Sequence, residues 1–214
     1  MSIYYKGSDY VANKIIISTP SIDEVEKYLK KWDSLENYVL QENSLNKLFY
    51  ELVPNNKCME DILIKASTLN DFYSTNIFSI FPVAKHILNL DIDERLKNGD
   101  PQLVNEISQI MINGKSKNFY SFATKYCSHH YPLSFPIYDS YVEKILIYFR
   151  NKDHFLDFEK IDLKDYEKFK NILIKFAEFY KIDNFNLKDL DRYLWQLGKE
   201  YFPKSYRKEN QNDK

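Results

Sequence analysis

Cysteine and long apolar runs are both scarce in this sequence. The 214-residue chain has two cysteines, Cys58 and Cys127, and no Cys-x-x-Cys pair or cluster of cysteine with histidine. This pattern excludes a disulfide framework and a structural zinc site, and no metal or cofactor is expected. No apolar stretch approaches the roughly 18 residues of a transmembrane helix, and no charged segment followed by an apolar one stands at the N-terminus. We therefore expect a cytoplasmic protein with no membrane partner.

Glycine and proline are also few. Four glycines and seven prolines leave little material for tight turns between strands, and the apolar residues mostly recur at helical spacing. A hydrophobic fraction of 44% is too high for a disordered chain, and a charged fraction of 29% is too high for a membrane bundle. The sequence predicts a monomeric, all-α protein with at most one or two short strands. Residues 1–203 would form one compact domain, and 204–214 a disordered polar tail.

Capping residues and apolar spacing predict where the helices begin and end. Ser21 opens a Ser-x-x-Glu capping box, Asp100 precedes a proline at a first helical position, and Asn186 caps the last helix. The strand-like run Ile15–Ile17 is short enough to be a single extended segment, and Pro82 should bend or divide its helix. The predicted helices cover residues 21–31, 33–52, 59–70, 75–90, 101–112, 119–130, a segment from 139 onward, 163–181 and 187–202.

One stretch of the chain has no acidic residue. The 32 residues from Ile107 to Tyr138 contain no aspartate or glutamate but include Lys115, Lys117 and Lys125, a local charge of +3. The net charge of the whole chain is −1, so binding to a polyanion would need such a local basic face. The stretch therefore marks a candidate surface for nucleic acid.

The acid-free stretch ends at Asp139, at the expected start of a helix. Free backbone N–H groups and the positive end of the helix dipole would keep this carboxylate ionised. An ionised carboxylate beside a cationic surface suits the stabilisation of positive charge that develops on a sugar bound to DNA. A plain helix N-cap is the alternative role for this residue.

Two segments around this carboxylate resemble a known family. They read Ser121-Phe-Ala-Thr-Lys125 and Ser134-Phe-Pro-Ile-Tyr-Asp139-Ser-Tyr-Val-Glu-Lys-Ile-Leu146. The 18 positions from Ser121 to Asp139 and the motif that follows resemble the core of the helix-hairpin-helix DNA glycosylase superfamily. The likeness is greatest to adenine glycosylases of the MutY type, which have serine where other members have a catalytic lysine.

The family's glycine-rich hairpin is degenerate in this chain. Lys117-Asn118-Phe119-Tyr120 stands where the family has a Leu-Pro-Gly-Val-Gly sequence, and Gly114 is the nearest glycine. A DNA phosphate would then be bound by Lys115, Lys117 and Asn118 instead of the hairpin backbone, or this phosphate site would be absent. The iron–sulfur cysteine motif of some relatives is missing, so no cluster is expected.

The resemblance implies two helical lobes with a cleft near residues 115–142, and base excision from double-stranded DNA, in repair or in defence against phage. A nucleotide with a damaged or modified base would be flipped into the cleft. Asp139 would stabilise the oxocarbenium-like sugar and orient water for hydrolysis of the N-glycosidic bond. With Ser121 in the lysine position we favour a monofunctional enzyme. Lys125, one helical turn further, is the alternative as an amine nucleophile.

Several further residues are candidates for binding. Asn70 and Tyr73 lie in a segment that loosely corresponds to the family's wedge into the base stack. Candidates for the base pocket are Tyr138, Tyr141 and His129, although His129 would also serve as a cation at a helix C-terminus. Trp195 shares a predicted stripe with leucines and is expected to be a core residue or an anchor that joins the lobes.

Two other kinds of function compete with base excision. The first is a non-catalytic module that binds DNA or protein on the same scaffold. The second is a helical nuclease or toxin, which the sequence disfavours because it contains no convincing metal-ligand or Arg/His signature. The identity of the base does not follow from the sequence, because several distant helices shape such a pocket.

Overall fold

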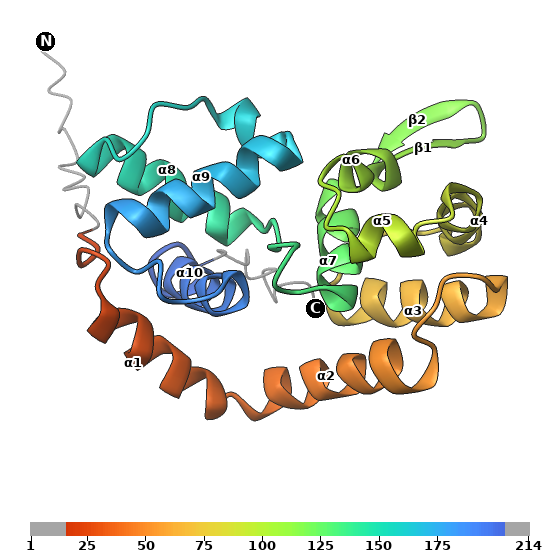
Figure 1. Ribbon diagram of the computed structural model, residues 1–214, viewed down its shortest axis with the longest axis horizontal. Helices are drawn as coiled ribbons and strands as arrows, with labels where there is room; N and C mark the ends of the chain where they lie inside the picture. Colours follow the sequence, from red (N-terminus) through yellow and green to blue (C-terminus); the bar gives the residue numbers. More distant parts are fainter. Residues whose placement is uncertain (1–15, 204–214) are drawn as a thin grey trace, which may run out of the picture.

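The computed structural model describes residues 16–203 and shows an all-α protein with one small hairpin (Figure 1). The elements of the described part are α1 (Ile22–Asp33), α2 (Glu36–Asn46), a π-helical turn (Lys47–Leu52), α3 (Met59–Phe72), α4 (Ile80–Leu90), α5 (Asp93–Lys97), α6 (Gln102–Ser108), β1 (Gln109–Ile112), β2 (Lys115–Asn118), α7 (Tyr120–His130), α8 (Ser140–Asp153), a 3-10 turn (Lys160–Lys164), α9 (Tyr166–Phe179) and α10 (Leu187–Tyr201). The predicted fold class is therefore confirmed.

The helices gather in two lobes (Figure 1). One lobe contains α3 to α7 with the hairpin, and the other contains α8, α9 and α10 together with α1. Helix α2 and the segment 131–139 are the two places where the chain passes between the lobes. Residues from both ends of the described chain thus build one lobe, because α10 packs against both α1 and α8.

Helix α10 shows how the sequence produces this packing. Asn186 caps it, since its side-chain oxygen accepts hydrogen bonds from the backbone N–H groups of residues 188 and 189 at 2.9 and 3.0 Å. Leu190, Leu194 and Leu197 recur at helical spacing and are buried. Gly198 continues this buried face, and its missing side chain lets α10 lie directly against α8. This contact holds the start of α8 in place.

Three helices agree closely with the predicted ones. Helix α7 begins within one residue of the predicted start and ends at His130, and α8 begins immediately after Asp139. Helix α10 begins at Leu187, as its cap predicts. These ends depend on hydrogen bonds between residues a few positions apart, which the sequence alone displays.

Other predicted boundaries were wrong. The predicted helix 33–52 is interrupted before Glu36 and ends in the π-helical turn, and α5 was not predicted. The predicted helix 75–90 begins only at Ile80, because Ser74 and Asn76 have positive φ angles of 48° and 58°, which end a right-handed helix. Pro82 therefore lies in the first turn, where no helical hydrogen bond to its nitrogen is lost and no kink arises.

The predicted helix 101–112 ends at Ser108, and a β-hairpin follows. The two strands pair from Gln109 opposite Asn118 to Ile112 opposite Lys115, which leaves a two-residue loop. Both loop residues have positive φ angles, 50° at Asn113 and 73° at Gly114, as a type I′ turn requires. An Asn-Gly pair is the usual sequence of this turn, so the signal was present in the sequence and was missed.

The remaining differences concern the ends of the chain. Residues 16–20 form no strand. The side chain of Ile17 is buried, and its backbone N–H and C=O form hydrogen bonds with the side chains of Tyr148 and Lys152 on α8. Ile15 and the predicted tail 204–214 lie outside the described residues. The predicted helix 163–181 is shorter, since the 3-10 turn precedes α9.

Candidate functional site

A cavity of about 290 Å³ lies between the lobes, and we call it the interlobe cavity. Side chains from α1, α2, α3, α7, α8 and α10 line it. The lining residues used below are Trp32, Tyr38, Glu42, Tyr73, Ser74, Lys125, Asp139, Tyr141, Lys188, Asp191, Arg192, Trp195 and Lys199. It combines aromatic walls with seven charged side chains, those of Glu42, Lys125, Asp139, Lys188, Asp191, Arg192 and Lys199.

Asp139 enters this cavity from the N-terminus of α8. Its Oδ1 accepts a hydrogen bond of 2.8 Å from the backbone N–H of Tyr141, so the carboxylate is the N-cap of the helix. The side chain is nevertheless 23% exposed and belongs to the cavity lining. Asp139 can therefore cap α8 and still present its carboxylate to a ligand in the cavity.

Lys125 reaches the same point from α7. Its side chain is only 3% exposed, and Nζ lies 4.0 Å from Oδ2 of Asp139. Nζ also donates to Oγ of Ser121 at 2.6 Å, to the backbone oxygen of Ser121 at 3.3 Å and to that of Tyr138 at 3.4 Å. Buried in this way, Lys125 adds no charge to the surface, so the exposed charge of the acid-free stretch comes from Lys115 and Lys117.

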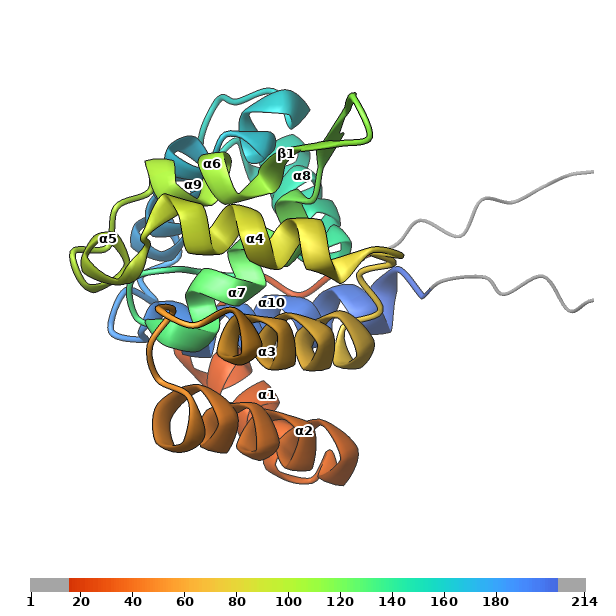
Figure 2. The same cartoon turned by 90° about the vertical axis from the view of Figure 1, so that its right-hand side faces the viewer.

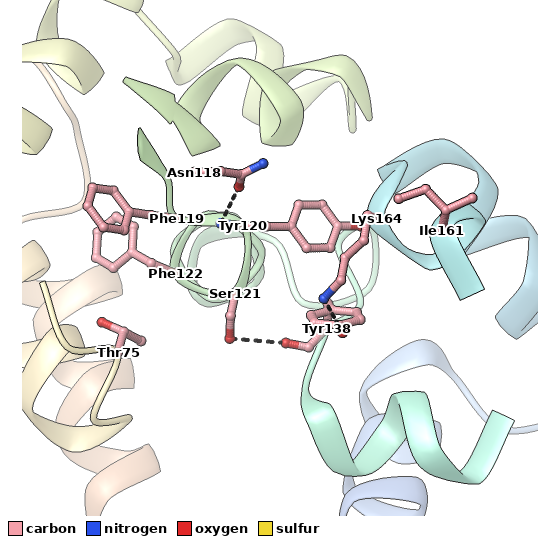
Figure 3. Close-up of a pocket in the computed structure, with 9 residues that line it drawn as sticks. All are labelled: Thr75, Asn118, Phe119, Tyr120, Ser121, Phe122, Tyr138, Ile161 and Lys164. Atoms are coloured by element: carbon pink, nitrogen blue, oxygen red, sulfur yellow. Dashed lines mark hydrogen bonds between the residues drawn. The ribbon is translucent and has the colours of Figure 1, made fainter. Parts of the chain in front are cut away.

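Ser121 lies between the interlobe cavity and a second, more open cavity of about 500 Å³ at the start of α7, which we call the hairpin cavity (Figure 3). Its Oγ donates to the backbone oxygen of Tyr138 at 3.4 Å and accepts from Lys125. In the hairpin cavity, the Lys164 ammonium lies 3.9 Å from the centre of the Tyr138 ring. The predicted catalytic group of Asp139, Ser121 and Lys125 is therefore brought together at the junction of the two cavities.

An aromatic wall faces the charged end of the interlobe cavity. Trp195 of α10 meets Tyr38, Trp32 and Tyr141 edge to face, with ring centres 4.9, 5.9 and 6.4 Å apart. The Lys199 ammonium lies 4.5 Å from the Tyr38 ring centre, which shows that these faces accept a cation. Flat rings of this kind also stack on nucleobases.

Charged residues form a further wall. Glu42 pairs with Lys188 at 2.9 Å and with Arg192 at 2.8 Å. Burial acts to raise the pKa of Glu42, but these two cations outweigh it and lower the pKa. Glu42 is therefore an ionised, fully paired carboxylate.

Asp191 behaves differently from the other carboxylates of the cavity. Burial raises the pKa of Asp191 to about 6, against the opposing effect of the Lys188 and Lys125 charges, and Asp139 and Glu42 contribute to the rise. A carboxyl with a pKa near the working pH of an enzyme is a candidate for proton transfer.

The predicted DNA contacts fall in two groups. Lys115, Lys117 and Asn118 lie on the fully exposed strand β2, outside the interlobe cavity. The side chain of Asn118 also accepts a hydrogen bond of 2.9 Å from the backbone N–H of Tyr120 and so supports the start of α7. Asn70 holds the α3–α4 loop, because its side chain bonds both backbone groups of Ile77 at 3.0 and 3.2 Å.

The predicted aromatic and histidine candidates are spread over different places. Tyr73 and Tyr141 line the interlobe cavity, and the Lys125 ammonium lies 5.2 Å from the Tyr73 ring centre. Tyr138 lines the hairpin cavity instead. His129 lines neither; it is buried, its Nε2 lies 2.9 Å from the Tyr73 hydroxyl, and burial lowers its pKa to about 3. It is therefore neutral, and the interpretation as a helix C-terminal cation was wrong.

Several residues of the interlobe cavity were not found from the sequence. Asp191 and Glu42 were not predicted. Trp195 was expected as a core residue or an anchor between the lobes, and it contacts rings of α1, α2 and α8 while also lining the cavity. Lys188, Asp191, Trp195 and Lys199 follow one another at spacings of three or four residues. This second stripe on α10 was the available signal.

Residues 24–134 match the HI_0787 N-terminal domain family, which is more than half of the chain. The chain belongs to this family. It is also 57% identical over 148 residues to an uncharacterized protein of Haemophilus influenzae, in an alignment that covers 69% of this chain and 71% of that protein. No solved structure matches the chain.

The part that matches the family supplies only some of the site. It contains Tyr73 and Lys125, whereas Asp139, Asp191 and Trp195 come from residues that follow it. The interlobe cavity therefore needs both the family domain and residues of α8 and α10 with the segment before α8. Within residues 16–203, no group of three or more histidine, cysteine or acidic side chains is placed to hold a metal ion, and no helix has the length and apolar character needed to cross a membrane.

Proposed function

We propose that this protein is a DNA glycosylase that hydrolyses the N-glycosidic bond of a damaged or modified base flipped into the interlobe cavity. The observation that carries the proposal is the position of Asp139, a carboxylate at a helix N-terminus that opens into an aromatic cavity between two lobes.

The carboxylate of Asp139 suits the sugar end of such a reaction. When the N-glycosidic bond breaks, positive charge develops on the deoxyribose, and a fixed anion stabilises it. The hydrogen bond from the Tyr141 N–H fixes Oδ1, while Oδ2 has no backbone donor and lies 4.0 Å from Nζ of Lys125. The same oxygen can accept a proton from an attacking water molecule.

The surroundings of Lys125 favour water as the nucleophile. An ammonium has three hydrogens, and three oxygen acceptors from Ser121 and Tyr138 lie within 3.4 Å of Nζ, with the Asp139 carboxylate beside them. These acceptors stabilise the charged form, which has no lone pair for attack on the sugar. Lys125 then acts through Asp139, by holding its carboxylate in position.

Double-stranded DNA can approach from the side of the hairpin. The hairpin, the α3–α4 loop and the C-terminal end of α10 lie on the same side of the molecule (Figure 2). Lys115 and Lys117 are exposed on that hairpin, and Phe78 in the loop is fully exposed. Ser74 of the same loop and Lys199 near the end of α10 belong to the lining of the interlobe cavity. Cationic and apolar groups of this kind contact phosphates and base steps.

The test uses the full chain and duplex oligonucleotides that carry uracil, hypoxanthine, 8-oxoguanine, 7-methylguanine or adenine opposite 8-oxoguanine. Base release is measured as alkali-labile abasic sites. Asp139→Asn keeps a good N-cap residue and removes the charge, so we expect it to fold normally and to lose about 10²-fold or more in rate. Asp165→Asn is the matched control, because Asp165 caps α9 in the same way outside the cavity.

The possible results separate the alternatives. Equal rates of base release for Asp139→Asn and the wild type would show that the Asp139 carboxylate does not take part in catalysis. DNA binding without base release from any oligonucleotide would favour the non-catalytic module. Borohydride should trap no covalent adduct; an adduct on Lys125 would replace water by the lysine amine as the nucleophile.

A further inference from the structure

A lysine of the protein itself covers part of the aromatic wall of the interlobe cavity. Tyr38 of α2 and Trp195 of α10 meet at an interplanar angle of 69°, with ring centres 4.9 Å apart, and we call this pair the aromatic corner. The Lys199 ammonium lies 4.5 Å from the Tyr38 ring centre and 4.8 Å from that of Trp195. A flat ligand therefore cannot stack on these two faces while Lys199 keeps this position.

The contacts that hold Lys199 over the aromatic corner are modest. Within residues 16–203 they are the two ring faces and the Tyr38 hydroxyl, to which the ammonium donates a hydrogen bond, and none of them is a carboxylate. A cation–π contact near solvent is weaker than a charge-assisted hydrogen bond to a phosphate. An anionic partner that comes within reach can therefore draw the ammonium away from the rings.

Lys199 also lies where such an anionic partner would arrive. Its side chain is exposed near the C-terminal end of α10, on the side of the molecule that carries the hairpin and the α3–α4 loop (Figure 2). The flexible four-carbon stem of a lysine lets its ammonium move by bond rotation while the helix stays in place. The same ammonium can thus serve the aromatic corner or a phosphate at the surface.

Building on the proposed function, we propose that Lys199 is a residue that selects DNA over free bases. In the free protein its ammonium blocks the aromatic corner. When DNA binds, the ammonium moves to a backbone phosphate and leaves the corner to the flipped base.

This exchange makes phosphate binding and base stacking depend on each other. A base within a DNA strand brings the phosphate that removes Lys199 from the rings. A free base brings no phosphate and must compete with the ammonium for the same faces. The cavity therefore admits a nucleotide of a DNA strand in preference to the bases that are abundant in solution.

The experiment uses the full chain with Trp32→Phe as the parent protein. The chain has two tryptophans, so this change leaves Trp195 as the fluorescent reporter of the aromatic corner. Lys199→Ala is compared with the control Lys144→Ala. Lys144 is an exposed lysine of α8 whose ammonium also lies near a ring, 5.8 Å from the Tyr141 ring centre, but it does not line the cavity.

Two ligands are measured with each protein. Free adenine is titrated while the quenching of Trp195 fluorescence is followed. A labelled duplex with adenine opposite 8-oxoguanine is titrated by fluorescence anisotropy over a series of salt concentrations. Thermal unfolding checks that every variant is folded.

We expect Lys199→Ala to change the two affinities in opposite directions. Without the ammonium the aromatic corner is open, so adenine should bind at least about threefold more tightly than to the parent. One phosphate contact is lost, so the duplex should bind about threefold to tenfold more weakly, and the slope of log K against log salt should become shallower by about 0.9. Lys144→Ala should match the parent with both ligands, and Lys199→Arg, which keeps the charge, should keep the affinity for the duplex.

Two results would overturn the role of Lys199 and leave the glycosylase proposal intact. One is adenine binding by Lys199→Ala that is no tighter than that of the parent. The other is an unchanged affinity and salt slope with the duplex. Absence of base release by the wild type from every oligonucleotide would instead overturn the proposed function, and the two binding measurements would still decide whether Lys199 blocks the aromatic corner.

Discussion

Helices α8 and α10 meet at Gly198, and the substitution Gly198→Ala is expected to push them apart. A Cβ atom at this position would lie 2.6 Å from Cβ of Tyr141, 2.7 Å from its backbone oxygen and 2.8 Å from its backbone carbon. Non-bonded carbon atoms prefer a separation of about 3.5–4.0 Å, so the helices would have to separate by about 1 Å. Two of the three atoms belong to the backbone and cannot rotate away.

The expected loss of stability follows from two opposing effects. Alanine is better than glycine in a helix interior by about 1 kcal/mol. Over-packing costs about 1–3 kcal/mol, and the upper half of that range applies because the contacts involve backbone atoms. We therefore expect the free energy of unfolding to fall by about 1–2 kcal/mol. For a domain of this size, that corresponds to a fall in Tm of about 2–8 °C.

Urea unfolding and thermal unfolding of the full chain measure this change. The control is Asn171→Ala on the exposed face of α9, which also introduces a better helix former but makes no close contact. It should raise the free energy of unfolding by a few tenths of a kcal/mol. Opposite signs for the two variants would separate the clash from helix propensity.

The same substitution should reach the candidate site, because Tyr141 follows Asp139 by two residues at the start of α8. A shift of about 1 Å at a catalytic group costs roughly 10²-fold in rate. Base release by Gly198→Ala should therefore fall more than its stability alone explains. A variant as stable as the wild type would refute the close approach of the two helices at this position.

Two further predictions concern buried polar groups. Asn56 is buried and joins three elements, since its side chain bonds Asp93 at 2.7 Å, the Lys65 ammonium at 2.7 Å and the Tyr126 hydroxyl at 2.6 Å. Asn56→Ala strands these partners and should lower the free energy of unfolding by about 2–4 kcal/mol in urea, and a loss below about 1 kcal/mol would contradict this network. His129 has a pKa near 3 in the folded state, so its contribution to stability is complete above its unfolded pKa and declines as the pH falls below it. Between pH 6 and 5, the wild type should lose about 1.2 kcal/mol more than His129→Gln, and parallel pH curves would show that His129 titrates normally.

Part of the candidate site was readable from the sequence because it depends on local hydrogen bonds. Asp139 at the start of α8 and Asn186 at the start of α10 satisfy backbone N–H groups two or three residues away. The spacing of Ser121 and Lys125 on one helix likewise places their side chains one turn apart. The Asn113-Gly114 turn belongs to this class as well, since its φ angles follow from its residue types.

The other part was decided by tertiary structure. The sequence determined the helical class, the ends of α7 and α10, the start of α8, and the local position of the Asp139 carboxylate. Only the fold brings Glu42 of α2 and Trp32 of α1 against α10, and only burial makes His129 neutral and Asp191 a weak acid. Caps and periodicity involve neighbours a few residues apart, whereas burial and the pKa of a side chain depend on every element that packs around it.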